Sequence, residues 1–101
     1  MLMIKRIVRM DVAAASEAMF LDIFEDVKKE IRAQNGCLGL EVLRSEGESH
    51  ISIWTISLWE SPDALERYRS STLFQSTWSR VKPLFIHKAQ AWTLTPIETI
   101  V

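Results

Sequence analysis

The segment 51–65 constrains the fold of this chain more than any other part of the sequence. Residues 51–59 are almost all β-branched, aromatic or apolar, which predicts a strand. Ser61, Pro62 and Asp63 then predict the start of a helix. Serine caps helix N-termini, proline suits the first turn, and an acidic side chain favours the positive end of the helix dipole. The segment therefore predicts a strand that runs directly into a helix.

Both faces of this predicted strand carry bulky side chains, because alternate residues of a strand point to opposite faces. An antiparallel strand with one solvated face would alternate apolar and polar residues, so we expect both faces to be covered. One face is expected to carry Ile51, Ile53 and Trp59, and the other Trp54, Ile56 and Leu58.

The rest of the pattern predicts the element order βαββαβ. Asn35-Gly36 is expected to end the first helix, and the glycine-containing turn 46–49 to join two strands as a hairpin. This order predicts a ferredoxin-like α+β fold, with a four-stranded antiparallel sheet whose first and third strands are central. The length of 101 residues predicts a single domain over 1–101. Strands are expected at 3–12, 37–45, 51–59 and 86–95. The segment 13–16 is expected to lead into a first helix that ends near residue 33, and further helices are expected at 61–70 and 73–82.

Composition argues against several classes of function. The 12 basic and 13 acidic residues give a net charge of −1 without a basic stripe, so no nucleic-acid partner is expected. No apolar run approaches the roughly 20 residues of a membrane span, and the N-terminus lacks a signal-peptide pattern. The single Cys37 cannot form an internal disulfide and fits a reducing compartment. We therefore expect a cytoplasmic protein that does not bind membranes.

The second sheet face predicts a homodimer. The two helices of the βαββαβ order cover one face, while the other carries Trp54, Ile56 and Leu58. A monomer would leave an apolar patch larger than soluble monomers usually tolerate. We therefore expect two copies to pack their open sheet faces together.

Two blocks of the sequence match a known pair of motifs. Residues 35–41, NGCLGLE, resemble a PGC-x-G-Y-E segment, with Asn35 in place of proline and Leu40 in place of an aromatic residue. Residues 58–65, LWESPDAL, followed by Tyr68 and by STLF at 71–74, resemble a W-x-S-x-E-A-(L/F)…H…S-x-x-F run. Both motifs are typical of the antibiotic biosynthesis monooxygenase family, which the chain resembles over nearly its whole length.

This resemblance implies a dimeric α+β barrel with a pocket between the sheet and the helices of each subunit. Some members of the family oxidise aromatic substrates with O₂ and without metal or flavin, and others degrade haem. The haem-degrading members use Asn, Trp and His where this chain has Arg9, Tyr68 and Trp78, which argues against haem degradation. The resemblance implies a cofactor-independent monooxygenase acting on a small aromatic or quinol-type substrate. The alternative is a non-catalytic small-molecule-binding or structural dimeric module.

Tyr68, His87 and Arg9 are the candidate catalytic residues. His87, expected on the last strand, is either a hydrogen-bonded structural residue or a general base, because imidazole titrates near neutral pH. Arg9 either pairs with Glu41 or Glu60, or binds an anionic oxygen in a cavity. Tyr68 either packs in the core or orients a phenol or carbonyl oxygen of the substrate.

Trp78, Phe74 and Trp54 are the candidate pocket residues, because a flat aromatic substrate would stack on their rings. Core packing is the alternative for these side chains, and dimer-interface packing is a further one for Trp54. His50 is expected to be exposed and inert at the hairpin turn. His50 and His87 are far apart in sequence and lack a flanking carboxylate pattern, so no metal site and no cofactor are expected.

The geometry of the interior separates the two functions. An enclosed cavity above roughly 300 Å³ with Arg9 or His87 pointing into it would favour the enzyme. A filled interior, with Tyr68 and Trp78 packed on Leu58 and Phe85, would favour the module.

Overall fold

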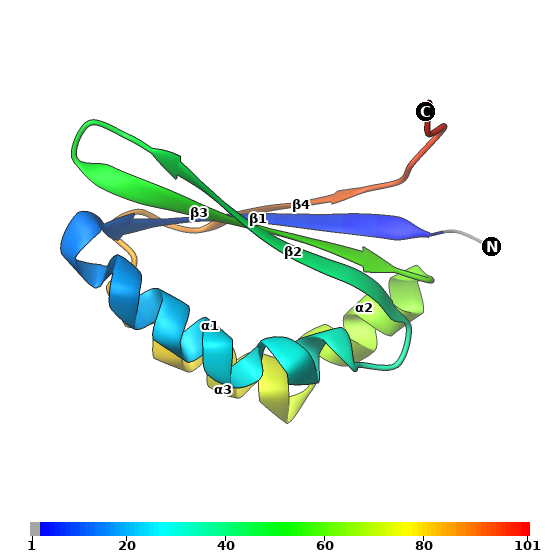
Figure 1. The fold of residues 1–101 in the computed structure, drawn as a ribbon. Coiled ribbons are helices and arrows are strands. Elements are labelled where there is room, and N and C mark those ends of the chain that lie inside the picture. Colours follow the sequence, from blue (N-terminus) through cyan, green and yellow to red (C-terminus); the bar gives the residue numbers. More distant parts are fainter. Residues whose placement is uncertain (1–2) are drawn as a thin grey trace.

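The computed structural model describes residues 3–101 and shows a four-stranded antiparallel sheet with helices on one face (Figure 1). The strand order β2-β3-β1-β4 places the first and third strands in the centre. This confirms the predicted ferredoxin-like α+β fold. The strands are β1 (Ile4–Ala13), β2 (Cys37–Glu46), β3 (His50–Trp59) and β4 (Gln90–Leu94). The helices are α1 (Glu17–Arg32), α2 (Pro62–Arg69) and α3 (Thr72–Val81), with the short 3-10 helices η1 (Ala14–Ser16) and η2 (Lys82–Leu84).

Serine caps determine where the two later helices begin. The Ala64 backbone N–H donates to Ser61 Oγ at 3.2 Å, and Pro62 occupies the first turn of α2. The Phe74 backbone N–H donates to Ser71 Oγ at 3.1 Å in the same way. The second cap explains why the chain is divided into α2 and α3 at the predicted interruption.

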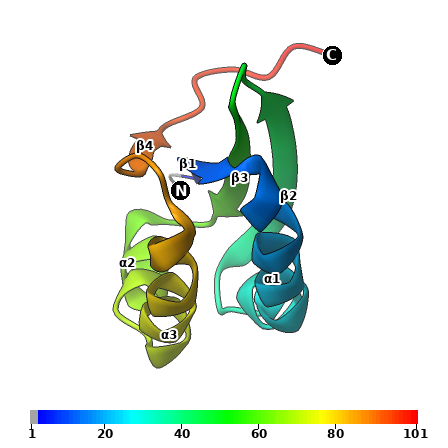
Figure 2. The same ribbon diagram turned by 90° about the vertical axis from the view of Figure 1, so that its left-hand side faces the viewer.

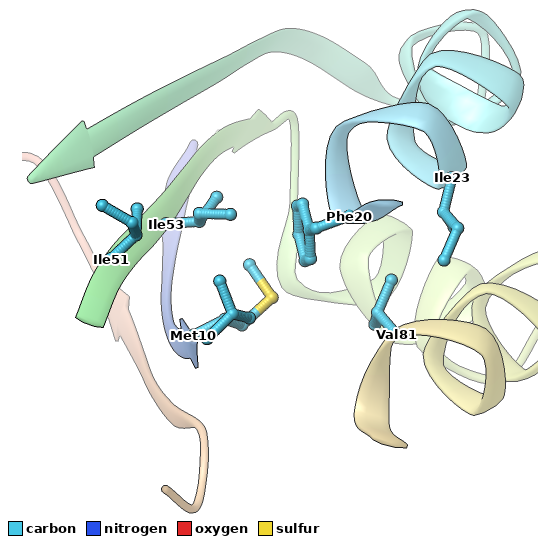
Figure 3. Packing of buried hydrophobic residues seen from close by; sticks show 7 residues of the cluster. Met10, Phe20, Ile23, Ile51, Ile53 and Val81 are labelled. Carbon is cyan, nitrogen blue, oxygen red and sulfur yellow. The ribbon is translucent and has the colours of Figure 1, made fainter. Parts of the chain in front are cut away.

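Figure 2 shows the sheet and the helical layer, and the hydrophobic core lies between them. A second buried cluster lies near α2 and includes Cys37, Trp59 and Leu65. Because the strands of the sheet alternate, one face of β1 and β3 supplies most of the core residues from the sheet. Figure 3 shows the main cluster, in which the labelled residues are Met10, Phe20, Ile23, Ile51, Ile53 and Val81.

Within residues 3–101, the opposite face of the sheet is not covered by a helix (Figures 1 and 2). Leu43, Trp92 and Leu94 are exposed there, and Trp54 stacks on Trp92 with 6.3 Å between ring centroids. We call this surface the open face. The bulky residues of β3 therefore divide between the core and the open face, as the alternation predicts.

The last strand is shorter than expected and begins at Gln90 rather than at residue 86. Phe85 pairs with Val12 in an isolated bridge, while Gln90 pairs with Arg9. The chain advances five residues from Phe85 to Gln90, while β1 advances only three between their partners Val12 and Arg9. The residues between Phe85 and Gln90 must therefore loop out of the sheet. This loop contains His87, and the prediction that His87 lies on a strand is wrong.

A β-bulge at the start of β2 changes the face of the sheet to which the first side chain points. Cys37 pairs with Trp59 and Gly39 with Leu58, so the residue between them is left out of the ladder. Regular alternation would place Cys37 and Leu40 on different faces of the sheet. Because of the bulge, both side chains point toward the helices. Cys37 is consequently buried in the core.

Among residues 3–101, we find no helix with the length and apolar character needed to cross a membrane.

Candidate functional site

A cavity of about 290 Å³ lies between the sheet and the helices. Every strand and all three α-helices contribute to its wall. Most of the wall is apolar, with Val8, Met10 and Leu40 supplied by the strands. The polar side chains of the wall are Arg6, Thr55, Ser57, Tyr68, Arg69 and Thr77.

A chain of aromatic rings forms one side of this cavity. Tyr68 stacks on Trp59 with 5.1 Å between ring centroids and meets Phe74 edge-on at 5.3 Å. Phe74 lies parallel to Trp78 at 5.9 Å, and Trp78 meets Phe85 edge-on at 5.4 Å. The structure thus places Tyr68, Phe74 and Trp78 together in the wall. A flat ligand ring would find stacking partners there.

The Tyr68 hydroxyl remains protonated at neutral pH. Burial raises the pKa of Tyr68 to about 12, because the phenolate is less well solvated than the phenol. Tyr68 can therefore donate a hydrogen bond to a ligand oxygen, but it cannot serve as a base at neutral pH.

Two guanidinium groups, from Arg6 and Arg69, line the same cavity. Arg6 Nη1 donates to Thr93 Oγ1 at 3.0 Å, and Arg69 Nη1 lies 3.5 Å from Glu66 Oε2. Burial lowers the pKa of Arg6, and the positive charge of Arg69 lowers it further. Arginine still keeps its charge at neutral pH, so the pair would stabilise an anionic group in the cavity. Neither residue was predicted from the sequence to line the pocket, although the alternation of β1 places Arg6 on the same face as Val8.

The buried hydroxyl of Thr77 is a further polar group of the wall. Within the described part of the chain, Thr77 Oγ1 has no hydrogen-bond partner. An unpaired buried hydroxyl costs about 1–3 kcal/mol, so a ligand atom that bonded to it would gain that energy. Threonine at this position carried no signal in the sequence, because its burial depends on how α3 docks.

Arg9 and Trp54 lie on the open face and do not line the cavity. Arg9 Nε lies 3.2 Å from Asp11 Oδ1, and its guanidinium carbon is 5.4 Å from the Trp54 ring centroid. Arg9 therefore pairs with Asp11 and not with Glu41 or Glu60. The expected place of Arg9 and Trp54 in the pocket is wrong. Side chains alternate along β1 and β3, and these two point to the face of the sheet away from the helices.

His87 also lies outside the cavity, in a cluster around the buried Asp11. Asp11 Oδ1 accepts hydrogen bonds from Ser52 Oγ at 2.6 Å and from Arg9 Nε at 3.2 Å. Asp11 Oδ2 lies 2.9 Å from His87 Nδ1 and 3.9 Å from His50 Nε2. The expectation that His50 is exposed is wrong, and the two histidines lie together although they are far apart in sequence. Their ring centroids are 5.5 Å apart, and the His50 side chain is 21% exposed.

The Asp11 cluster predicts a loss of stability in acid. Burial raises the pKa of Asp11, but the hydrogen bonds from Ser52, His87 and Arg9 outweigh it and lower the pKa to about 2. A carboxyl whose pKa is lowered by folding contributes stability above its unfolded value, near 3.8, and loses it as the pH falls toward 2. Asp11 should thus contribute up to about 2 kcal/mol at neutral pH.

The measurement is urea unfolding of the wild type and of Asp11→Asn at about pH 5 and about pH 2. The difference in unfolding free energy between the two proteins should shrink by about 2 kcal/mol at the lower pH. Glu48→Gln is the control, because Glu48 is exposed. A difference that stays constant with pH would contradict the assignment.

A comparison with protein families identifies the family of this chain. The family model described as antibiotic biosynthesis monooxygenase matches residues 3–78, from the start of β1 into α3. The chain belongs to this family. The matched region includes most of the cavity wall, although β4 lies beyond it.

Solved structures share this fold at low sequence identity. A Caulobacter crescentus protein is 24% identical, covers 95% of this chain and 91% of its own, and has a TM-score of 0.84. A Mycobacterium tuberculosis protein is 16% identical, covers 98% and 99%, and has a TM-score of 0.85. SnoaB from Streptomyces nogalater, a cofactor-independent oxygenase, is 18% identical, covers 99% and 98%, and has a TM-score of 0.83. A comparison with curated proteins gave no match.

Proposed function

We propose that this chain is a cofactor-independent monooxygenase that oxidises a small aromatic or quinol-type substrate in its cavity. The observation that carries the proposal is the combination of an aromatic wall with two guanidinium groups in one apolar cavity. Membership of the family supports it, as does the likeness to SnoaB, which is a cofactor-independent oxygenase.

The cavity would hold the substrate as an anion. Its ring would stack against Phe74 and Trp78, and its oxygen would lie near Arg6 and Arg69, which favour the ionised form of a bound phenol or enol. The neutral Tyr68 hydroxyl would donate a hydrogen bond to a second substrate oxygen. Such an anion can pass an electron to O₂ itself. In the complete reaction, one atom of O₂ enters the substrate, the other leaves as water with two hydrogens from the substrate, and the substrate supplies all the electrons.

A non-catalytic binding module is the second candidate, and the wall of the cavity favours it in one respect. Among the described residues that line the cavity, none is a histidine, a carboxylate or a thiol, so none can act as a general base near neutral pH. The volume is also near the lower end of the range for small-molecule sites, about 300 Å³. In this candidate the cavity binds the same aromatic ligands without turnover.

O₂ consumption with a panel of quinols and hydroxylated aromatics separates the two candidates. For the enzyme, Tyr68→Phe should lower kcat/KM by about tenfold, because it removes one hydrogen bond and keeps the ring stacked on Trp59. Ser79→Ala, at an exposed site of α3, is the control and should keep full activity. Ligand binding without O₂ uptake across the panel would favour the module. Neither binding nor O₂ uptake would contradict both candidates.

The open face supports a homodimer, which we propose as the functional assembly. Leu43, Trp92 and Leu94 are exposed there beside Trp54. Face-to-face packing of two sheets would bury these side chains. Sedimentation at micromolar concentration should give the mass of two chains, and a mass of one chain would contradict this assembly.

A further inference from the structure

We propose that Asp11, His50 and His87 form a binding site for a divalent first-row transition-metal ion such as Zn²⁺. The two imidazoles converge on one carboxylate oxygen, with Asp11 Oδ2 2.9 Å from His87 Nδ1 and 3.9 Å from His50 Nε2. One potential ligand atom from each residue lies within 4.8 Å of the other two. The cluster shares no residue with the cavity wall, so it is a separate site.

The donor set suits such an ion. Two imidazole nitrogens and one carboxylate oxygen are ligands that zinc and its first-row neighbours use, with further positions left for water or a ligand. Bonds of about 2.0–2.1 Å in tetrahedral geometry place ligand atoms roughly 3.3 Å apart. The separations of 2.9 Å and 3.9 Å lie on either side of this value. Movements of roughly half an ångström would bring these two separations to that value, and the ligand atoms of His50 and His87 lie within 4.8 Å of each other.

The surrounding residues hold Asp11 and His50 in position. Ser52 Oγ and Arg9 Nε both donate to Asp11 Oδ1, which leaves Oδ2 directed at the two rings. Outer hydrogen bonds of this kind orient metal-binding carboxylates. The His50 ring lies against Gly47, where an added Cβ would be 2.9 Å from His50 Cε1. The hairpin turn thus leaves room for this imidazole only because residue 47 has no side chain.

His87 leaves the site accessible. It lies in the loop between the Phe85 bridge and β4, outside the ladder of the sheet. In the single chain its side chain is 59% exposed, so an ion can reach the cluster from solvent. The Ile86 backbone N–H donates to the Asp11 carbonyl oxygen at 2.9 Å, so the loop also holds His87 beside Asp11.

Arg9 limits the affinity of the site. Its guanidinium lies against the Asp11 carboxylate and partly neutralises the charge that would attract a cation. We therefore expect dissociation constants on the order of micromolar, weaker than those of closed structural zinc sites.

Calorimetric titration of the untagged full chain with Zn²⁺, together with the visible absorption of its Co²⁺ complex, tests the site. The wild type should bind one ion per chain. His87→Ala and His50→Ala should each weaken binding by at least about tenfold and remove the Co²⁺ bands. Ser52→Ala should weaken affinity by roughly tenfold while one ion per chain still binds, because it loosens the carboxylate without removing a ligand. Glu48→Gln, on the same hairpin, is the matched control and should bind as the wild type does.

Two outcomes would overturn the proposal. One is the absence of Zn²⁺ binding by the wild type at millimolar concentration. The other is unchanged binding in His87→Ala, whose exposed side chain can be removed without loss of the fold. If His50→Ala does not fold, as judged by circular dichroism, His87→Ala decides alone.

Discussion

Replacing Trp59 with alanine is expected to lower the free energy of unfolding by about 4 kcal/mol, the largest effect of any single change considered for this chain. Trp59 is fully buried, stacks on Tyr68 with 5.1 Å between ring centroids, and donates from Nε1 to Ser57 Oγ at 2.9 Å. The substitution would leave a void between β3 and α2 and an unpaired hydroxyl on Ser57. Urea unfolding at one fixed chain concentration measures the loss.

Trp54→Ala is the matched control, with the same residue type on the same strand and the opposite face. Trp54 is half-buried, and its ring contacts Trp92 and Arg9. Its removal should lower the stability of an isolated subunit by no more than about 2 kcal/mol. The comparison is made at a chain concentration at which sedimentation gives the mass of one chain, because a homodimer through the open face would add an interface loss to Trp54→Ala. Equal losses there would contradict the assignment of the core to the helix side of the sheet.

Ala91→Phe is expected to weaken ligand binding in the cavity by about 100-fold, which corresponds to about 2.7 kcal/mol. Ala91 lies on β4 and lines the cavity. A benzyl group there would occupy the space that the ring of a quinol needs beside the aromatic wall. Fluorescence titration with a quinol follows the loss through the tryptophan in this wall, Trp78.

Gln90→Phe controls for the added ring. Gln90 is the preceding residue of β4 and pairs with Arg9, so its side chain points to the open face. This variant should bind the quinol as tightly as the wild type. Equal weakening in both variants would show that the ligand does not occupy the cavity.

Local patterns in the sequence predicted the fold because the structure contains the same local features. The serine caps of α2 and α3 and the two-faced alternation of β3 depend only on nearby residues. These features determined the element order, and the element order determined the sheet. The aromatic side chains Tyr68, Phe74 and Trp78 were singled out for the same reason, since helical spacing directs them toward the sheet.

The places of Arg9, His50 and His87 could not be predicted in this way. Each depends on contacts between distant parts of the chain, above all on the extra residues that loop out before β4. Asp11 gave no signal of its own, yet it pairs with Arg9 and lies beside both histidines. The bulge at Leu38 is a further departure, because one unpaired residue reverses the expected direction of Cys37.

The alternation of β1 separates two incompatible environments by a single residue. Arg6, Val8 and Met10 face the cavity, while Arg9 and Asp11 face the opposite side of the same sheet. A slip of one residue in the pairing of β1 with β3 would carry the carboxylate of Asp11 into the apolar interior and expel Met10 into water. The charged residues that look misplaced on a central strand therefore act against the wrong register, and they help to specify one pairing among its near neighbours.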